Sequence, residues 1–265
     1  MRSTAVRRTA LAASAAALAL LVTACGGSSD DGSGDSASDK AGGSSESTQA
    51  GKTAAGKALT SADLTKAALV QADVKSGTLT EKVPAKDDIA QAKVTSEDAA
   101  CAPLAYLQSG SYVGKPAATV KRTWKGDAAK PAAGASEEEQ FLAALDLEQA
   151  IITLASYADG GAEQAMKDLN TAAEKCAAGF SYTVAGTATK AANVVTTAAP
   201  EGADEALALT VNVDADGVKA PMKAVILRKG ATVVYLPAAN FAAGATGKDF
   251  DFPTELVDAQ LAKLS

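Results

Sequence analysis

Histidine is absent from this sequence of 265 residues. Histidine is the commonest general base and metal ligand, so its absence excludes Ser-His-Asp and Cys-His catalysis and the usual zinc sites. The patterns Gly-x-Ser-x-Gly and Ser-x-x-Lys, which mark other catalytic serines, do not occur either. An acidic chain offers many pairs of carboxylates, and the sequence selects none of them. We therefore expect a protein that is not an enzyme and that carries no cofactor and no metal.

Aromatic residues are scarce, at 4% of the chain, although 47% of the residues are hydrophobic. Much of that fraction is alanine, so the core should consist of small and aliphatic side chains. Basic residues are also few. Three of the 25 Lys and Arg residues precede Cys25, which leaves 22 basic and 31 acidic residues from there on, a net charge of −9. Nucleic-acid binding needs clustered Lys and Arg, so we expect no nucleic-acid partner.

No apolar run reaches the ~20 residues that a membrane-spanning helix needs. Residues 9–22 form an apolar run of 14 residues behind Arg2, Arg7 and Arg8, which is typical of a secretory signal peptide. Leu21-Val22-Thr23-Ala24-Cys25 matches the lipobox of bacterial lipoproteins. We predict a signal peptide at 1–24 and a lipid on the thiol of Cys25, which places the protein on the outer face of the cytoplasmic membrane. Ordinary cleavage beside an incidental cysteine is the alternative.

Residues 25–58 contain Gly, Ser, Ala and charged residues with no large apolar side chain. Such a segment cannot bury enough surface to fold, so we predict a lipidated, disordered tether at 25–58. Gly51–Lys57 matches a phosphate-binding loop, but Ala58 stands where Ser or Thr would bind Mg²⁺, and no strand precedes it. We therefore read 51–57 as tether, followed by one extracellular domain at 59–265.

The periodicity of apolar residues in 59–265 predicts an α+β fold, an antiparallel-rich β-sheet packed against a few helices. The expected helices are a short one capped by Thr60 or Ser61, one that begins near 96–98 and is kinked or restarted at Pro103, one at 162–176 ended by Gly179, and one at 254–264. The expected strands are 117–125, 145–157, 180–187, 193–197, 205–213, 218–228 and 231–236, with hairpin turns at 214–217 and 229–230.

Two acidic clusters resemble metal sites only superficially. Three adjacent carboxylates at 137–139 do not converge on one point, so a solvated face or the first turn of a helix is the better interpretation. The Asp-x-Asp-Gly piece at 214–217 lacks the acidic residue that closes a calcium loop, so it is expected to be a turn.

Cys101 and Cys176 are the two thiols left after Cys25. Both lie on apolar faces of expected helices, and an exported protein meets an oxidising compartment. We therefore predict a disulfide between them. A catalytic thiol is the alternative, but no histidine is present to hold a thiolate.

The order of motifs resembles a known family. A lipobox and a Ser/Gly tether precede Leu59-Thr60-Ser61-Ala62-Asp63-Leu64, Cys101-Ala102-Pro103-Leu104, an alanine-rich helix ending at Cys176, and the strand phrase at 224–230. This arrangement is similar to the PknH-like extracellular sensor domains and the related lipoproteins of actinobacteria. The resemblance covers about 59–265 and implies an α+β fold with a ligand-binding cleft. It carries over no ligand residues, and this chain can form one disulfide where the family type has two.

Together these features predict a membrane-anchored, non-catalytic lipoprotein that binds a small ligand or an envelope protein. Two alternatives stay open: an accessory subunit of a membrane complex, and a carrier of lipids or other apolar ligands in the cell envelope.

Overall fold

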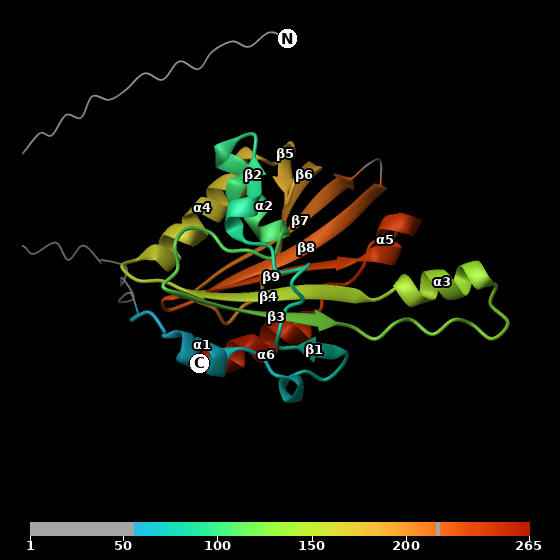
Figure 1. Cartoon of the computed structure of the whole chain (residues 1–265), viewed down its shortest axis with the longest axis horizontal. Coiled ribbons are helices and arrows are strands. Elements are labelled where there is room, and N and C mark those ends of the chain that lie inside the picture. The colour runs from blue at the N-terminus through green and yellow to red at the C-terminus, as the bar shows by residue number, and fades with distance from the viewer. Residues whose placement is uncertain (1–55, 216–217) are drawn as a thin grey trace, which may run out of the picture. The chain divides into compact units, whose positions relative to one another are not determined.

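Strands with alternating apolar residues build one antiparallel sheet. The structure is a computed structural model that describes residues 56–215 and 218–265. In this part of the chain, nine strands pair in the order β1-β3-β4-β9-β8-β7-β6-β5-β2 (Figure 1). The strands are β1 (Thr78–Thr80), β2 (Val94–Ser96), β3 (Ala118–Lys125), β4 (Glu148–Ser156), β5 (Phe180–Val184), β6 (Thr187–Thr197), β7 (Glu205–Ala215), β8 (Val218–Lys229) and β9 (Thr232–Asn240). The predicted α+β class is confirmed.

Six α-helices in the described residues accompany the sheet, and several begin at side chains that cap them. They are α1 (Ser61–Ala67), α2 (Ala102–Gln108), α3 (Glu137–Leu145), α4 (Gly161–Lys175), α5 (Phe241–Thr246) and α6 (Thr254–Leu264). The side chains of Thr60, Ser136 and Asn240 accept hydrogen bonds from the first free N–H groups of α1, α3 and α5. A 3-10 turn (Ala99–Cys101), capped by Asp98, leads into α2, whose first turn contains Pro103. A restarted helix at this proline is one of the two predicted outcomes.

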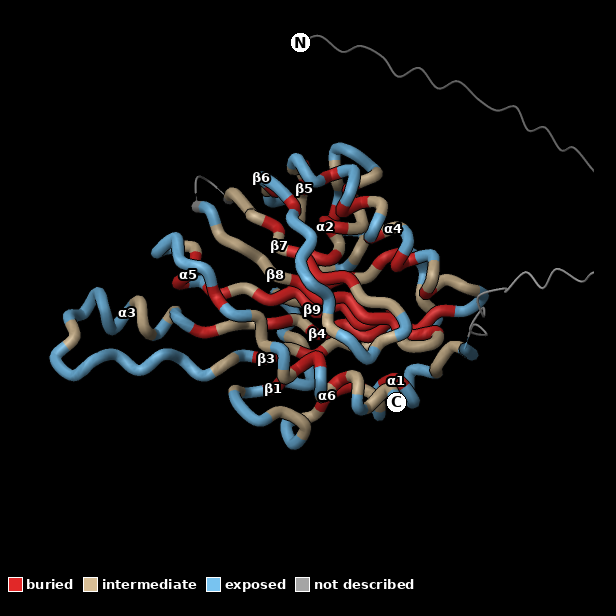
Figure 2. The backbone as a smooth tube through the Cα atoms, turned by 180° about the vertical axis from the view of Figure 1, so that it is seen from behind, coloured by how far each residue is buried: buried red, intermediate tan, exposed pale blue. Residues whose placement is uncertain are grey.

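The two faces of the sheet bury different residues of each strand. On β8, Ala224 and Ile226 belong to a core covered by α2 and α4, whereas Val225 and Leu227 belong to a core covered by α1 and α6. We call these the α4 face and the α6 face. Figure 1 shows the two helix pairs on opposite sides of the sheet, and Figure 2 shows that the buried residues concentrate in the central strands.

The disulfide lies on the α4 face. Cys101 at the start of α2 bonds to Cys176 at the end of α4, with their Cα atoms 5.9 Å apart. Both residues are buried in the core of that face. The bridge therefore holds the two covering helices together, as the sequence predicts.

Long-range pairs close the middle of the sheet. Strand β4 pairs with β9 in the register Glu148↔Asn240 to Ser156↔Thr232. Close to this seam, the backbone N–H of Leu59 donates a 2.8 Å hydrogen bond to Oγ of Ser156. The first described residues of the chain are thus attached to the central strands.

Several sequence predictions are corrected. The strand predicted at 145–157 begins only at Glu148, because Ser136 caps a helix that runs through Leu145. Helix α4 ends at Lys175, before the predicted 176, and Gly179 follows three residues after the Cys176 cap, although its φ of +102° is positive as expected. Strand β6 begins at Thr187, not 193. The helix at 254–264 is confirmed as predicted.

Some predictions lie outside the described residues. They are the signal peptide at 1–24, the lipid on Cys25, residues 25–55 of the tether, which include most of the phosphate-binding-loop match, and the turn residues 216–217. Strands β7 and β8 do pair on either side of that turn, with Ala215 opposite Val218. Within 56–215 and 218–265, the helices are too short or too polar to cross a bilayer.

Candidate functional site: an apolar pocket on the α6 face

The helices cover the α6 face unevenly. Helix α1 contacts β3 and β4, and α5 and α6 contact β8, whereas β6 and β7 are contacted mainly by α4, on the opposite face. Toward β6 the α6 face therefore reaches solvent, and Val195 of β6 is 49% exposed. A pocket lies at this boundary between covered and open sheet.

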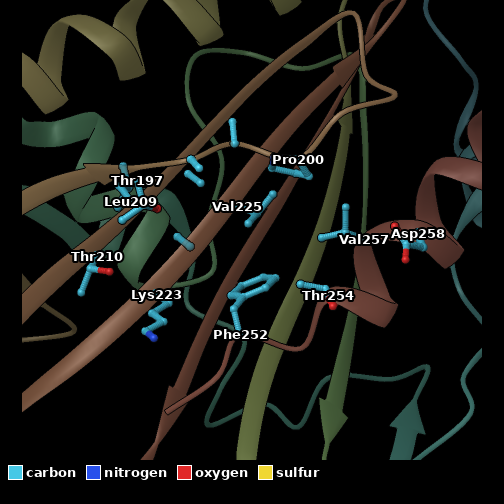
Figure 3. Close-up of a pocket in the computed structure, with 14 residues that line it drawn as sticks. Thr197, Pro200, Leu209, Thr210, Lys223, Val225, Phe252, Thr254, Val257 and Asp258 are labelled. Carbon is cyan, nitrogen blue, oxygen red and sulfur yellow. The ribbon is translucent and has the colours of Figure 1, made fainter. Parts of the chain in front are cut away.

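The pocket has a volume of about 380 Å³. Its floor is formed by β7 and β8, one wall by the chain that follows β6, and the other wall by the chain that leads into α6 (Figure 3). We call it the β7–β8 pocket. Its lining residues are Thr197, Ala198, Ala199, Pro200, Ala208, Leu209, Thr210, Lys223, Ala224, Val225, Phe252, Thr254, Val257 and Asp258.

Apolar side chains dominate this lining. Ala208 and Val225 come from paired positions of β7 and β8, and both are more than 90% buried. Phe252, in the chain leading into α6, and Val257, in the first turn of α6, lie beside Val225, as Figure 3 shows. An apolar floor with a few polar groups at the margin is the usual composition of a small-molecule pocket, and the volume falls within the usual range.

Lys223 provides the positive charge of the lining, and that charge is already paired. Its Nζ lies 3.0 Å from Oδ2 of Asp249, 5.1 Å from the centre of the Phe250 ring, and donates a hydrogen bond to the Phe250 carbonyl. The hydrogen bond from Lys223 holds the pKa of Asp249 below its usual range. Lys223 thus fastens the chain at 249–250 across β8.

Asp258 provides the negative charge of the lining. Within the described residues its carboxylate makes no salt bridge and no side-chain hydrogen bond, and it is exposed. In Figure 3, Lys223 and Asp258 lie on opposite sides of the pocket, with Val225, Phe252 and Val257 between them.

A buried arginine fixes the chain that forms the first wall. Nε of Arg228 donates a 2.7 Å hydrogen bond to Glu205, and its Nη1 lies 3.6 Å from Asp204 and 3.3 Å from Glu163. The backbone N–H of Asp204 also donates to the carbonyl of Arg228. These contacts hold the end of the connection between β6 and β7, a few residues after the part of it that lines the pocket.

Other hollows are less suited to a ligand. A hollow of about 420 Å³ between β2, β5 and β6 is lined largely by Thr, Ser and charged residues. Two more, of about 350 and 300 Å³, lie on either side of Lys248 and Asp249, beside α5. We prefer the β7–β8 pocket because a ligand that covers its apolar floor would remove apolar surface from water, which favours binding.

The structure places the cysteines predicted from the sequence away from this pocket. Cys101 and Cys176 form the bridge on the α4 face and do not line it. The acidic run at 137–139 forms the first turn of α3, where Ser136 and Glu139 make a capping box. The favourable charge at a helix N-terminus explains this placement. No group of three or more metal-binding side chains occurs in the described part of the chain.

One buried polar arrangement was not predicted. The hydroxyls of Tyr157 and Tyr235 lie 2.6 Å apart, and Tyr157 donates a 2.7 Å hydrogen bond to the Val113 carbonyl while Tyr235 accepts one from the Val113 N–H. Burial raises the pKa of both phenols, that of Tyr235 to about 12. Both rings are almost fully buried in the α4-face core, and their hydrogen bonds attach the loop at Val113 to that core.

Comparisons with known proteins yield similarities to solved structures, among them two mycobacterial proteins. No protein-family model and no curated protein matches the sequence. The extracellular domain of PknH from Mycobacterium tuberculosis superposes with a TM-score of 0.40 and 9% identity, over 78% of this chain and 95% of that domain.

An uncharacterized protein from Mycobacterium smegmatis superposes with a TM-score of 0.31 and 12% identity, over 72% of this chain and 87% of its own. The PknH domain is the type that the order of motifs in the sequence resembles. Both TM-scores lie below 0.5, so neither similarity carries an argument about function.

Proposed function

We propose that this chain is a lipid-anchored, extracytoplasmic protein whose domain binds a small ligand without transforming it. The observation that carries the proposal is the β7–β8 pocket. Its floor is apolar and buried, and its volume of about 380 Å³ suits a small molecule. The lining contains one lysine, which is paired, one aspartate and three threonines, and within the described residues no hydrogen bond joins a threonine hydroxyl to the lysine or the aspartate as a nucleophile–base pair would require. Binding therefore fits this site better than catalysis.

The proposed location is the outer face of the cytoplasmic membrane. It is supported by the apolar run at 9–22, the lipobox ending at Cys25, and the tether composition of 25–58. A disulfide within the domain is in keeping with an oxidising compartment. Incorporation of a labelled fatty acid tests the anchor: the wild-type chain should be labelled, and Cys25→Ser should not.

Thermal shift against a library of envelope metabolites tests ligand binding. The protein for this assay is the proposed mature chain, residues 25–265 with Cys25→Ser. A ligand of the pocket should raise the midpoint of wild-type unfolding, and Ala199→Trp should abolish the shift because the indole fills the pocket from its wall. Ala62→Trp is the matched control, since Ala62 is exposed on α1, away from the pocket. Equal shifts in both variants, or no shift by any compound, would contradict the proposal.

A second candidate function rests on α3. This helix has no buried residue and exposes Phe141 by 63%, and Figures 1 and 2 show it projecting beyond the ends of the strands. A projecting helix with an exposed aromatic residue suits an accessory subunit that contacts another envelope protein. Crosslinking in cells should then recover a complex that Phe141→Ser weakens. Recovery of monomer alone would argue against this role.

The third function considered, transport of lipids, needs room for acyl chains. The β7–β8 pocket, at about 380 Å³, is small for an acyl chain, and a neighbouring hollow of about 350 Å³ is lined by a different stretch of β7 and β8 and by Asp249, the partner of Lys223. Mass spectrometry of the purified chain would reveal a lipid carrier by its co-purified lipid.

A further inference from the structure

We infer that the β7–β8 pocket selects small amphiphiles with a cationic group, such as an alkyl- or arylammonium, over neutral and anionic molecules of the same shape. This inference rests on the proposed function and names the chemical class of the ligand. The apolar body of such a molecule would lie over Val225 and beside Phe252, and its ammonium group would meet Asp258.

The two charged residues of the lining, Lys223 and Asp258, do not form an ion pair with each other. Lys223 forms a salt bridge with Asp249 at 3.0 Å. It also donates a hydrogen bond to the Phe250 carbonyl and makes a cation–π contact with the Phe250 ring. An anionic ligand would have to displace these partners before it could use the lysine. Asp258, in contrast, makes no ion pair within the described residues, so a cation can approach its carboxylate without breaking an existing contact.

Further carboxylates follow the lining in the chain. Glu201 comes directly after Pro200, and Asp251 directly before Phe252; both are exposed, and neither makes a salt bridge in the part of the chain that the structure describes. Lys229 donates a 3.3 Å hydrogen bond to the Gly202 carbonyl, directly after Glu201, and offsets part of this charge. Asp251 and Asp258 therefore contribute most of the negative charge that would attract a cation at moderate salt.

The apolar part of the pocket favours the same class of ligand. Phe252 offers an aromatic ring beside the floor, and a cation near the face of an aromatic ring is attracted by its quadrupole. The apolar part of a ligand, with a few carbon atoms, would be shielded from water where it packs against the pocket floor. A molecule with both features satisfies both ends of the pocket, whereas a metal ion or a fully polar cation would leave the floor unused.

The test compares three probes with one apolar body: 4-phenylbutylamine, 4-phenylbutanol and 4-phenylbutanoate. Each is titrated into the mature chain (residues 25–265, Cys25→Ser), and amide NMR shifts of Val225, Phe252 and Val257 report on the pocket. We expect the amine to bind about two- to fivefold more tightly than the alcohol, as for a partly exposed ion pair, and the carboxylate to bind most weakly.

Two variants isolate the role of Asp258. In Asp258→Asn the amine should lose its advantage over the alcohol. Asp159→Asn removes the same charge before α4, at a residue with a φ of +52° that asparagine tolerates, and should leave the advantage intact. Raising the salt concentration should reduce the advantage in the wild-type chain.

The outcomes separate this inference from the proposed function. If the alcohol shifts the pocket residues but the amine binds no better, or if the carboxylate binds best, the cationic preference is wrong while ligand binding stands. If the amine's advantage survives Asp258→Asn, Asp258 is not its cause and the inference is wrong. If none of the probes shifts a pocket residue, the inference fails, and Ala199→Trp in the library assay then decides on ligand binding itself.

Discussion

The two faces of the sheet are formed by the same strands but are covered by helices to different extents. The α4 face is covered by two helices that a disulfide joins, and its core includes Met166, Leu169 and the buried pair of Tyr157 and Tyr235. The α6 face is covered over β3, β4 and β8, and toward β6 it opens into a pocket and exposed sheet. Both faces have a buried core, but the α4 face is closed and crosslinked, whereas the α6 face leaves part of the sheet open at the proposed binding site.

The contrast follows from where the covering elements lie in the sequence. Helix α4 comes between β4 and β5 and lies against β6 and β7 as well as β8 and β9. Helix α6 is the last element, and among the sheet strands it reaches β8. Covering helices on the two faces thus differ in how much of the sheet they span, and the uncovered part becomes available for binding.

The largest expected effect comes from removing the disulfide of the α4 face. In the chain with Cys25→Ser, the further changes Cys101→Ser and Cys176→Ser should lower the free energy of unfolding by roughly 4 kcal/mol. That is the chain-entropy value for a loop of this length, since the cysteines are 75 residues apart. Urea denaturation measures the change, and reduction of the bridged chain should reproduce it. Two free thiols in the oxidised Cys25→Ser chain would show that the bridge does not form.

Truncating a buried side chain should have an effect of similar size, and truncating an exposed one a much smaller effect. Leu169→Ala removes a fully buried side chain from the α4-face core and should cost about 2–5 kcal/mol. Val195→Ala, at the open part of the α6 face, should change the stability by less than about 1 kcal/mol. Thermal and urea unfolding of both variants measure the difference. Similar costs would mean that the two faces are equally well packed.

The tyrosine pair should make the α4 face sensitive to alkaline pH. Tyr157→Phe leaves the Val113 carbonyl without its phenol donor and should cost about 1–3 kcal/mol at neutral pH. Urea titrations at pH 7 measure this cost. If the stability is unchanged, the hydrogen bonds of this pair contribute little to the fold.

The pH dependence has a definite sign. A tyrosine in the unfolded chain titrates near pH 10, whereas burial raises the pKa of Tyr235 to about 12 and also raises that of Tyr157. The unfolded chain therefore loses its protons first. The stability is fully present below about pH 10 and is lost as the pH rises toward about 12. In Tyr157→Phe this loss should be shallower, and unfolding curves at several pH values test it.

The smallest expected effect is at the ion pair of the α6 face. Asp249 is largely exposed, so Asp249→Asn should lower the stability by less than about 1 kcal/mol. The same change frees Lys223, so 4-phenylbutanoate should bind more tightly to the variant than to the wild-type chain. If its affinity is unchanged, the pairing of Lys223 does not control which charges the pocket accepts.

The sequence predicts the periodic elements well and the edges of the sheet poorly. Strands β3, β7 and β8 and helix α6 are long and regular, and the disulfide follows from two buried-face cysteines. The short edge strands β1 and β2, of three residues each, are set by pairing with distant partners and leave no local pattern. The first turn of a helix was one of the two interpretations of the acidic run at 137–139, and α3 begins there. The rest of α3 was not predicted, although Ser136 and Glu139 form a capping box, a signal that is visible in the sequence.

The pocket could not be predicted from the sequence. Its floor residues, such as Val225, have the same alternating pattern as strand residues that a helix covers. Whether such a position is covered depends on where α6 and the chain after β6 come to lie, and these are long-range contacts. Asp258 likewise has the pattern of an ordinary exposed helix residue, and only its place in the pocket lining, opposite Lys223, suggests the role proposed above.

The pairing of β4 with β9 also determines when the domain can fold. Its outermost pairs join residues 76 and 92 positions apart, so β4 has no central partner until the chain has been delivered as far as Asn240. Contacts between such distant segments make folding slow. If the chain is exported as proposed above, the centre of the sheet can form only after β9 has crossed the membrane. We then expect the time taken by export to limit maturation as much as the stability of the finished sheet does.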